Sequence, residues 1–340
     1  MLTLSERHKR VLQAVIHDYT LTVEPVGSRT ISRKYLGLSP ATVRHVMSDL
    51  DEMGLLSQPH TSAGRVPTDR AFRFYVDSML ELQHLGEREK QHIRSGFESA
   101  LNEGHDIMKR TSHLLSAVCR QVGLVVAPRL EEIGLKHIEL IRIGRRRVMV
   151  VIISDRALVH NRVVRSEEDV DQRDLDHMSR TLNKMLAGLT FRSVGMRIEE
   201  EMRSDKASLD RLLTRALRFG REAVSAPQET DLYVEDSTRI FDQPEFLDVE
   251  RMKKLFRTLE EKSKLLKLLD AVLESEGVSV VMGSESALDE MSGCALIVSR
   301  YGTGPRAAGA LGVIGPIRMN YGKVIPVVEY VARLVSEYLN

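Results

Sequence analysis

Tryptophan is missing from this chain of 340 residues, and cysteine occurs only twice. Cys119 and Cys294 lie far apart without CxxC spacing, each in an apolar stretch, which predicts buried free thiols and argues against a disulfide framework. No hydrophobic run is long enough to cross a membrane. A charged amphipathic segment stands at the N-terminus in place of a signal peptide, so we expect a cytoplasmic protein with no membrane partner.

An excess of charge of one sign is also missing, because the formal net charge is +1. The chain as a whole therefore gives no polyelectrolyte signal for nucleic acid. Residues 1–77 hold ten Lys/Arg against eight Asp/Glu, a net charge of +2, and four histidines besides. Since each neutralised phosphate adds to DNA affinity, so modest a charge predicts that DNA binding by this segment depends on dimerisation.

Motifs of catalysis and metal binding are weak. The run 302–307 satisfies a loose GxGxxG/A pattern, but no helix follows it to hold a pyrophosphate, so a turn is predicted. Acidic residues at 171–177 are explained by the dipole of a helix start. His137 and Glu139 alternate on a predicted strand without the PCxxC of a zinc deaminase. The sequence predicts no enzyme, no cofactor and no metal site.

What the sequence does contain begins with three predicted helices in its first fifty residues. Thr3 and Glu6 form a capping box for the first helix. Ser28 is expected to cap the second helix and Gly37 to end it, directly before the next helix start. Such a tight connection between two helices is what a helix-turn-helix requires.

The run from Ser39 to Glu52 predicts the third helix, with Ser39 as N-cap and Pro40 in the first helical position. Apolar residues at helical spacing must face the core, which leaves the opposite face polar. An arginine near the start of such a helix can pair with guanine in a major groove. The candidate DNA-binding residues here are Ser39, Ala41, Thr42, Arg44, His45 and Ser48. A solvated amphipathic helix is the alternative.

A polar hairpin is predicted after this helix, with a flexible tip at 58–64 and a return strand at 65–67. This order, helix and then hairpin, is typical of a winged helix-turn-helix. Small and polar side chains on the wing suit phosphate or minor-groove contacts, which position a protein without reading sequence. The candidates are His60, Thr61, Ser62 and Arg65. An ordinary polar hairpin is the alternative.

Beyond the hairpin, strand-like runs lie on both sides of a mainly helical block. Three strands between 137 and 164 form a predicted antiparallel meander, with a turn at Arg145–Arg147 that is either solvated or a second nucleic-acid patch. Helices are predicted at 171–189, 208–224 and 252–273, and further strands follow before a terminal helix. The simplest topology is a helix-flanked antiparallel sheet with a folded insertion.

Several runs in this chain resemble the heat-inducible transcription repressor family HrcA. They are Glu24-Pro-Val-Gly-Ser28, Ser39-Pro-Ala-Thr-Val-Arg44, the wing segment 58–68 and Tyr75-Val-Asp77, with weaker matches at Pro244–Phe246 and Asn320–Ile325. The resemblance implies an α+β multidomain protein with a GAF-like domain that holds an inserted dimerising domain. We accordingly expect a DNA-binding head at 1–78, a helical linker at 79–104, a discontinuous GAF-like domain at 105–165 and 249–340, and an inserted mainly helical dimerising domain at 166–248.

The resemblance also implies a function. It implies a homodimeric repressor that binds an inverted-repeat DNA operator, called CIRCE, upstream of chaperone operons. A GroE-type chaperonin would keep the repressor active until heat stress diverts the chaperonin to unfolded proteins. Two alternatives stay open: a small-molecule-sensing regulator that uses the GAF-like domain as a pocket, and an enzyme with an accessory DNA-binding head.

Overall fold

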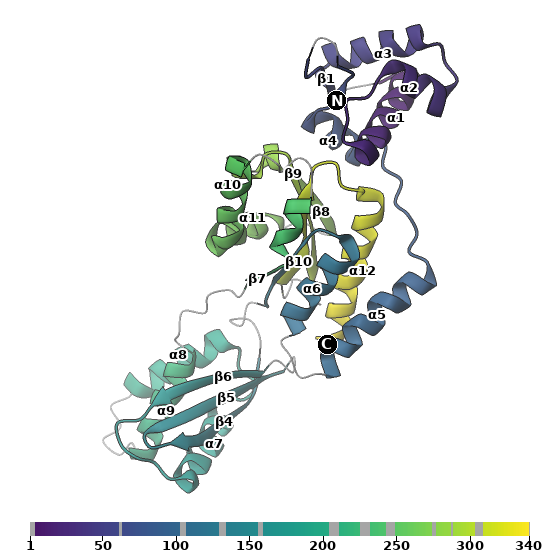
Figure 1. The fold of residues 1–340 in the computed structure, drawn as a ribbon. Coiled ribbons are helices and arrows are strands. Elements are labelled where there is room, and N and C mark those ends of the chain that lie inside the picture. Colours follow the sequence, from purple (N-terminus) through teal and green to yellow (C-terminus); the bar gives the residue numbers. More distant parts are fainter. Residues whose placement is uncertain are drawn as a thin grey trace. The chain divides into compact units, whose positions relative to one another are not determined.

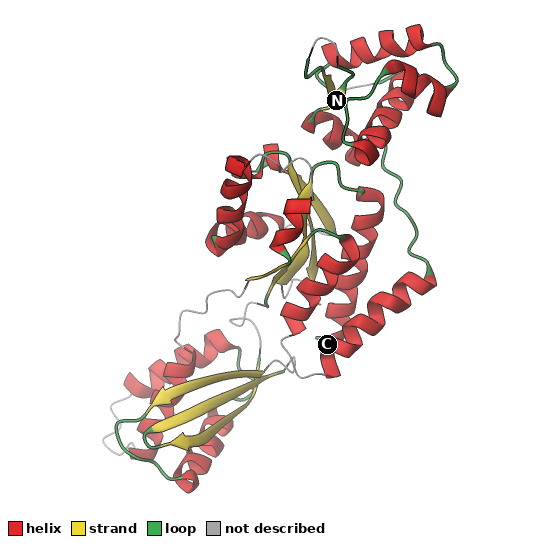
Figure 2. Ribbon diagram, viewed as in Figure 1, coloured by secondary structure: helices red, strands yellow, loops and turns green. Residues whose placement is uncertain are grey.

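The chain forms two compact units in the computed structural model, one made of Met1–Ala127 with Leu232–Ser336 and the other mainly of Pro128–Asp231. The elements of both are labelled in Figure 1 and coloured by type in Figure 2. The structure describes residues 4–60, 63–102, 107–128, 134–155, 159–203, 211–224, 232–242, 249–273, 277–286, 288–302 and 309–339.

The first unit begins with a winged helix-turn-helix head, as the sequence predicts. Its elements are α1 (Glu6–Thr22), α2 (Ser28–Ile31) continued by a π-helical turn (Ser32–Leu36), α3 (Pro40–Glu52), β1 (Leu56–Ser57), β2 (Val66–Pro67) and α4 (Asp69–Ser78). The two strands pair antiparallel, with Leu56 opposite Pro67.

The helix boundaries in the head confirm one sequence prediction and correct another. Gly37 ends the second helical segment in the left-handed conformation, at φ 62°, as expected. Gly27, not Ser28, is the N-cap of α2, and Ser28 is its first helical residue. Ser5 caps α1 with its side chain. Thr3, expected as the N-terminal residue of a capping box, lies outside the described residues, and it is Ser5 that accepts from the His8 amide at the helix start.

The rest of the first unit is built on a five-stranded antiparallel sheet in the order β7-β3-β10-β9-β8. The strands are β3 (Val122–Val126), β7 (Leu232–Glu235), β8 (Val278–Met282), β9 (Cys294–Tyr301) and β10 (Gly309–Pro316). Nearly every residue of β9 and β10 is buried, because helices cover both faces of the sheet (Figure 1).

The covering helices differ between the two faces. One face packs against α10 (Val249–Glu260) and α11 (Lys262–Leu273), which together bury a leucine-rich cluster. The other lies against α6 (Ile107–Cys119) and α12 (Tyr321–Tyr338) (Figure 1). The single helix expected at 252–273 is therefore two helices, which are interrupted at Glu261.

Part of the expected linker is a packed helix, α5 (Glu87–Asn102). Ile93 and Phe97 are buried on it, and a Cβ built on Gly96 would lie only 3.1 Å from a methyl carbon of Leu114 in α6. Gly96, which on propensity alone weakens a helix, thus allows α5 and α6 to approach closely. Gly104 lies outside the described residues.

The second unit is a three-stranded antiparallel sheet, β4 (Leu135–Gly144), β5 (Arg147–Ser154) and β6 (Val159–Arg165), backed by α7 (Gln172–Leu186), α8 (Phe191–Arg203) and α9 (Arg211–Val224). One face of the sheet and the three helices share a single hydrophobic core. Asn183 of α7 fastens the two layers, accepting from the Ile138 amide at 2.8 Å and donating to the Ile138 carbonyl at 2.7 Å.

This arrangement corrects the expected domain boundary at 165/166. The meander at 135–165 does not continue the five-stranded sheet but belongs to the inserted unit, which therefore contains strands as well as helices. The physical reason is that the alternation of apolar and polar residues predicts a strand but does not show which other segments the strand packs against. The apolar side of the meander is covered by the helices that follow it directly in the chain.

Two findings concern the composition. Both cysteines are free thiols, and Cys294 is buried as predicted, whereas Cys119 is partly exposed. Within the described ranges, no helix combines the length and the apolarity that a membrane span needs.

Candidate nucleic-acid interface

The start of α3 is fixed by a local cap. The Ser39 hydroxyl accepts from the Thr42 amide at 3.1 Å and lies 2.8 Å from the Thr42 hydroxyl, while Pro40 stands at the first position. Val43, Val46, Met47 and Leu50 are buried, as their spacing predicts. The side chains of Ser39 and Thr42, both candidates for DNA contact, are thus engaged with each other at the cap.

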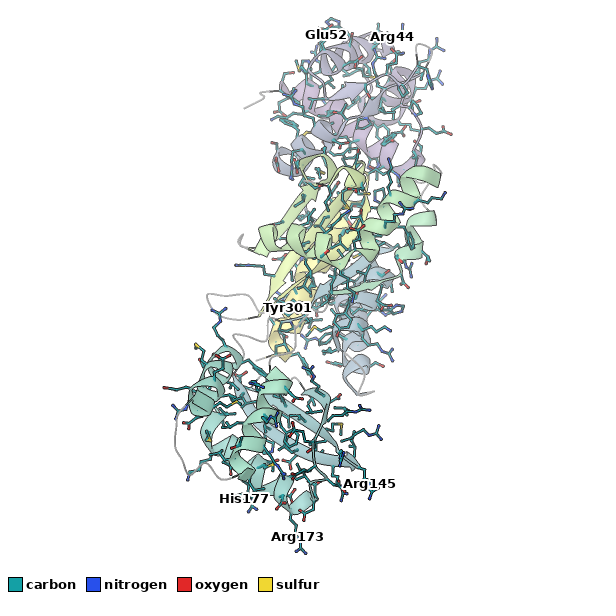
Figure 3. The ribbon with its side chains drawn as sticks, turned by 90° about the vertical axis from the view of Figure 1, so that its left-hand side faces the viewer. Arg44, Glu52, Arg145, Arg173, His177 and Tyr301 are labelled. Carbon is teal, nitrogen blue, oxygen red and sulfur yellow. The ribbon has the colours of Figure 1, made fainter. Side chains whose placement is uncertain are left out.

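The opposite side of α3 is open to solvent. Ala41, Arg44 and His45 are exposed, and Ser48 is partly exposed. Arg44 and Glu52 both lie at the outer surface of the head, as Figure 3 shows. This row is one face of a helix whose register is set by its buried residues, so its side chains are presented together. Four of the six helix candidates therefore form one surface.

The wing is attached to the rest of the head through its backbone. Val26, in the turn between α1 and α2, donates to the Arg65 carbonyl at 2.8 Å and accepts from the Arg65 amide at 2.9 Å. A Cβ on Gly64 would lie 2.4 Å from the Val26 carbonyl oxygen, so only glycine fits this approach. His60 is exposed near the wing tip. Thr61 and Ser62 lie outside the described residues.

Arg65, the wing candidate for a phosphate contact, also meets α3. Its side chain is only 21% exposed, and its Nε lies 3.0 Å from a carboxylate oxygen of Asp51 in α3. The guanidinium is therefore engaged within the head and joins the wing to the helix.

Sequence reasoning missed a second partner of α3, which comes from α1. Nε2 of His8 lies 3.3 Å from Oδ2 of Asp49, and Nε2 of His45 lies 4.0 Å from the same oxygen. The Ser5 hydroxyl lies 2.5 Å from Nδ1 of His8. Forty-one positions separate His8 from Asp49, so no local spacing could reveal the pair. The only signal was a polar residue on the first helix.

The head also contains a buried carboxylate, that of Asp18. The Asp18 side chain, 6% exposed, accepts from Lys34 Nζ at 3.1 Å and from the Tyr35 hydroxyl at 2.8 Å. Desolvation, with the Asp18 hydrogen bond and charge as further causes, raises the pKa of Tyr35 above its ordinary value. This cluster ties α1 to the segment before the turn and so supports the position of α3.

The other chemical patterns have structural explanations where the structure describes them. Asp171 is the N-cap of α7 and accepts from the Asp174 amide at 2.9 Å. His137 lies 2.9 Å from Glu139 at the surface. Among the described residues, no group of three or more potential ligands could hold a metal ion. Most of the glycine-rich run at 302–307 lies outside the described part.

The comparisons with known proteins agree with this architecture. "Winged helix-turn-helix transcription repressor, HrcA DNA-binding" is the family description that matches residues 3–81, and "HrcA protein C terminal domain" matches residues 105–325. A crystal structure described as that of a hypothetical protein has the same fold, with a TM-score of 0.66 at 20% identity and 99% of each chain covered.

Similar sequences extend over the whole chain. The heat-inducible transcription repressor HrcA of Geobacter sulfurreducens is 45% identical over 340 residues, covering all of this chain and 99% of the relative. The repressor of the same name from Syntrophobacter fumaroxidans is 44% identical, covering all of this chain and 98% of the relative. These similarities favour a repressor over a ligand-sensing regulator or an enzyme. Since they join the head and the C-terminal region at full length, the chain belongs to the heat-inducible transcription repressor family HrcA.

Proposed function

We propose that this chain represses transcription by binding an inverted-repeat operator of the CIRCE type as a homodimer, with α3 of each head in a major groove. The observation that carries the proposal is the exposed row on α3, presented by a capped helix beside a wing. Within this row, Arg44 stands in the second turn, from which a guanidinium can pair with guanine O6 and N7. His60 and the rest of the wing then lie along the phosphate backbone.

The inserted unit supports the proposed dimer. Its helices cover one face of the sheet β4-β5-β6, while the other face carries apolar residues, with Ile143 38%, Val159 59% and Val163 53% exposed. Met149 stands opposite Val163 and Ile141 in the register, which makes the patch continuous across three strands. Monomeric proteins rarely leave such patches uncovered. A second copy of the same face would cover this one and match the two-fold symmetry of an inverted repeat.

The proposal includes the partner that regulates the repressor. The relatives are named heat-inducible, which fits a repressor that a GroE-type chaperonin keeps active in the cytoplasm and that heat inactivates when the chaperonin is occupied. We assign this role to the full-length chain and propose that its five-stranded, helix-covered sheet is the GAF-like domain. No catalytic step belongs to the proposal.

The decisive experiment measures binding of purified full-length protein to an inverted-repeat operator and to a scrambled duplex at physiological salt. It is done with and without GroE-type chaperonin. Preferential operator binding that increases with chaperonin supports the proposal. Equal binding to both duplexes by folded protein would overturn its DNA-reading part, whereas operator preference that chaperonin leaves unchanged would overturn only the regulatory part.

A further inference from the structure

The proposed recognition helix has the wrong charge for its ligand. Between Pro40 and Glu52, α3 carries one permanently charged cation, Arg44, against three carboxylates. DNA has one phosphate charge for about every 1.7 Å of helix axis, so a helix in its groove experiences strong repulsion of its own negative groups. Something in the head must reduce this repulsion if α3 is to enter a groove.

The structure supplies a partner for two of the three carboxylates, each from a different element. Asp51 is paired with Arg65 of the wing at 3.0 Å, and Asp49 with His8 of α1 at 3.3 Å. Asp49 and Asp51 are two residues apart, so their side chains are about 200° apart around the helix axis and lie at opposite edges of α3. Both edges of the exposed row are thus flanked by a carboxylate that another element holds.

The contact from α1 has a defined proton arrangement. For His8 Nε2 to donate to Asp49, Nδ1 must be the acceptor in the neutral ring, and the Ser5 hydroxyl at 2.5 Å is placed to donate to it. The same hydroxyl accepts from the His8 amide at 3.3 Å as the N-cap of α1. The start of α1 therefore orients His8 toward the proposed recognition helix.

We propose that His8 and Arg65 are positioning residues for DNA binding, which hold the carboxylates of Asp49 and Asp51 at the edges of α3 and offset their repulsion of DNA phosphates. His45, at 4.0 Å from Asp49, shares in the first of these pairs. Neither His8 nor Arg65 has to touch a base. The inference rests on the DNA-reading face proposed above and adds residues outside α3 that this face needs.

A double-mutant cycle on the full-length protein tests the pair from α1. His8→Ala should weaken operator binding by about five- to tenfold, because the Asp49 carboxylate loses the hydrogen bond that holds it at the edge of α3. In the Asp49→Asn background the same substitution should have almost no effect, because the repelling charge is gone. Gln13→Ala, at another exposed position of α1, is the matched control and should leave binding unchanged. Thermal unfolding of each variant reports any loss of structure.

A second cycle tests the wing. Arg65→Ala should weaken binding, and Asp51→Asn should restore most of the loss. If Arg65 contacts a phosphate instead, the loss persists in the Asp51→Asn background and the log–log salt slope falls by about 0.9. Glu52→Gln removes the third carboxylate and should strengthen binding to operator and scrambled DNA alike.

The outcomes separate this inference from the proposed function. Losses that persist in both aspartate-to-asparagine backgrounds, or no loss on His8→Ala and Arg65→Ala, overturn the charge-offsetting role. If Arg44→Ala retains full operator preference, the reading face itself is wrong. If Arg44→Ala loses that preference while neither cycle shows rescue, the reading face stands and only the positioning role fails.

Discussion

Arg65 and Asp51 join the wing to α3 through a side-chain ion pair of 3.0 Å, and the Arg65 side chain is only 21% exposed. The backbone of Arg65 is at the same time paired with Val26 in the turn between the first two helices. One residue therefore fixes the wing relative to both the turn and α3. If helix and wing bind DNA as proposed, this pairing helps to hold them in the constant geometry that a groove-binding surface needs.

Replacing Arg44 should affect sequence reading more than general DNA affinity. If its guanidinium pairs with a base, Arg44→Ala weakens operator binding by about 1–3 kcal/mol while scrambled DNA loses much less. Arg44→Lys keeps the charge but not the two parallel hydrogen bonds, so it serves as the control. Fluorescence anisotropy on both duplexes is the measurement. Equal losses on both would show that Arg44 contacts phosphate only.

Removing the cap of α3 should destabilise the head. Ser39→Ala leaves the Thr42 amide without its side-chain acceptor, which costs about 0.5–2 kcal/mol for a typical N-cap. Ser39→Asp retains an acceptor and should behave like the native protein. Amide hydrogen exchange in the first turn of α3 measures the effect. Unchanged protection in Ser39→Ala would contradict the role assigned to the cap.

A single methyl group at position 64 should displace the wing. In Gly64→Ala the new Cβ would lie 2.4 Å from the Val26 carbonyl oxygen, and backbone atoms must move to relieve the contact. We expect weaker binding to operator and scrambled DNA alike, since the proposed contacts of the wing with the phosphate backbone would be displaced. Gly86→Ala, where a Cβ has nothing closer than 4.0 Å, is the matched control. Native affinity in Gly64→Ala would show that the wing position is not required.

A charge on the open face of the inserted sheet should dissociate the proposed dimer. Val163→Arg places a guanidinium on a strand position that is 53% exposed in the single chain, so the monomer should fold while association is lost. Arg173→Glu, at an exposed position on the opposite, helical layer, is the control. Analytical ultracentrifugation distinguishes monomer from dimer. A dimer that persists in Val163→Arg would place the interface elsewhere.

Loss of Asp18 should weaken the junction between α1 and the turn. Asp18→Asn keeps the shape but removes the charge that Lys34 and Tyr35 share, and we expect a lower unfolding temperature for the head. The pKa of Tyr35 should fall toward its ordinary value, because a neighbouring negative charge and hydrogen-bond acceptor contribute to raising it. Absorbance titration of the tyrosines follows the second effect. A Tyr35 pKa that is the same in Asp18→Asn as in the native protein would assign the shift to burial alone.

The sequence by itself determined the local structure of the head. Ser39, Pro40 and Gly37 act within one helical turn, and the apolar spacing of Val43 to Leu50 acts within one helix, so the bounds and the exposed row of α3 could be predicted. The motifs that resemble the HrcA family are likewise short runs of consecutive residues, which can be identified without the fold. Strand positions in the meander were also predicted, because alternation of side chains is a property of a single strand.

Only the tertiary structure decided which of these elements meet. The meander at 135–165 forms a separate sheet that packs against helices of the insertion and does not join the five-stranded sheet. Which elements meet is decided by packing between distant segments. Arg65 turned out to be held by Asp51, and Asp49 by His8, across 14 and 41 positions of the chain. Such pairs depend on how helices and wing pack in three dimensions, which no spacing within one element encodes.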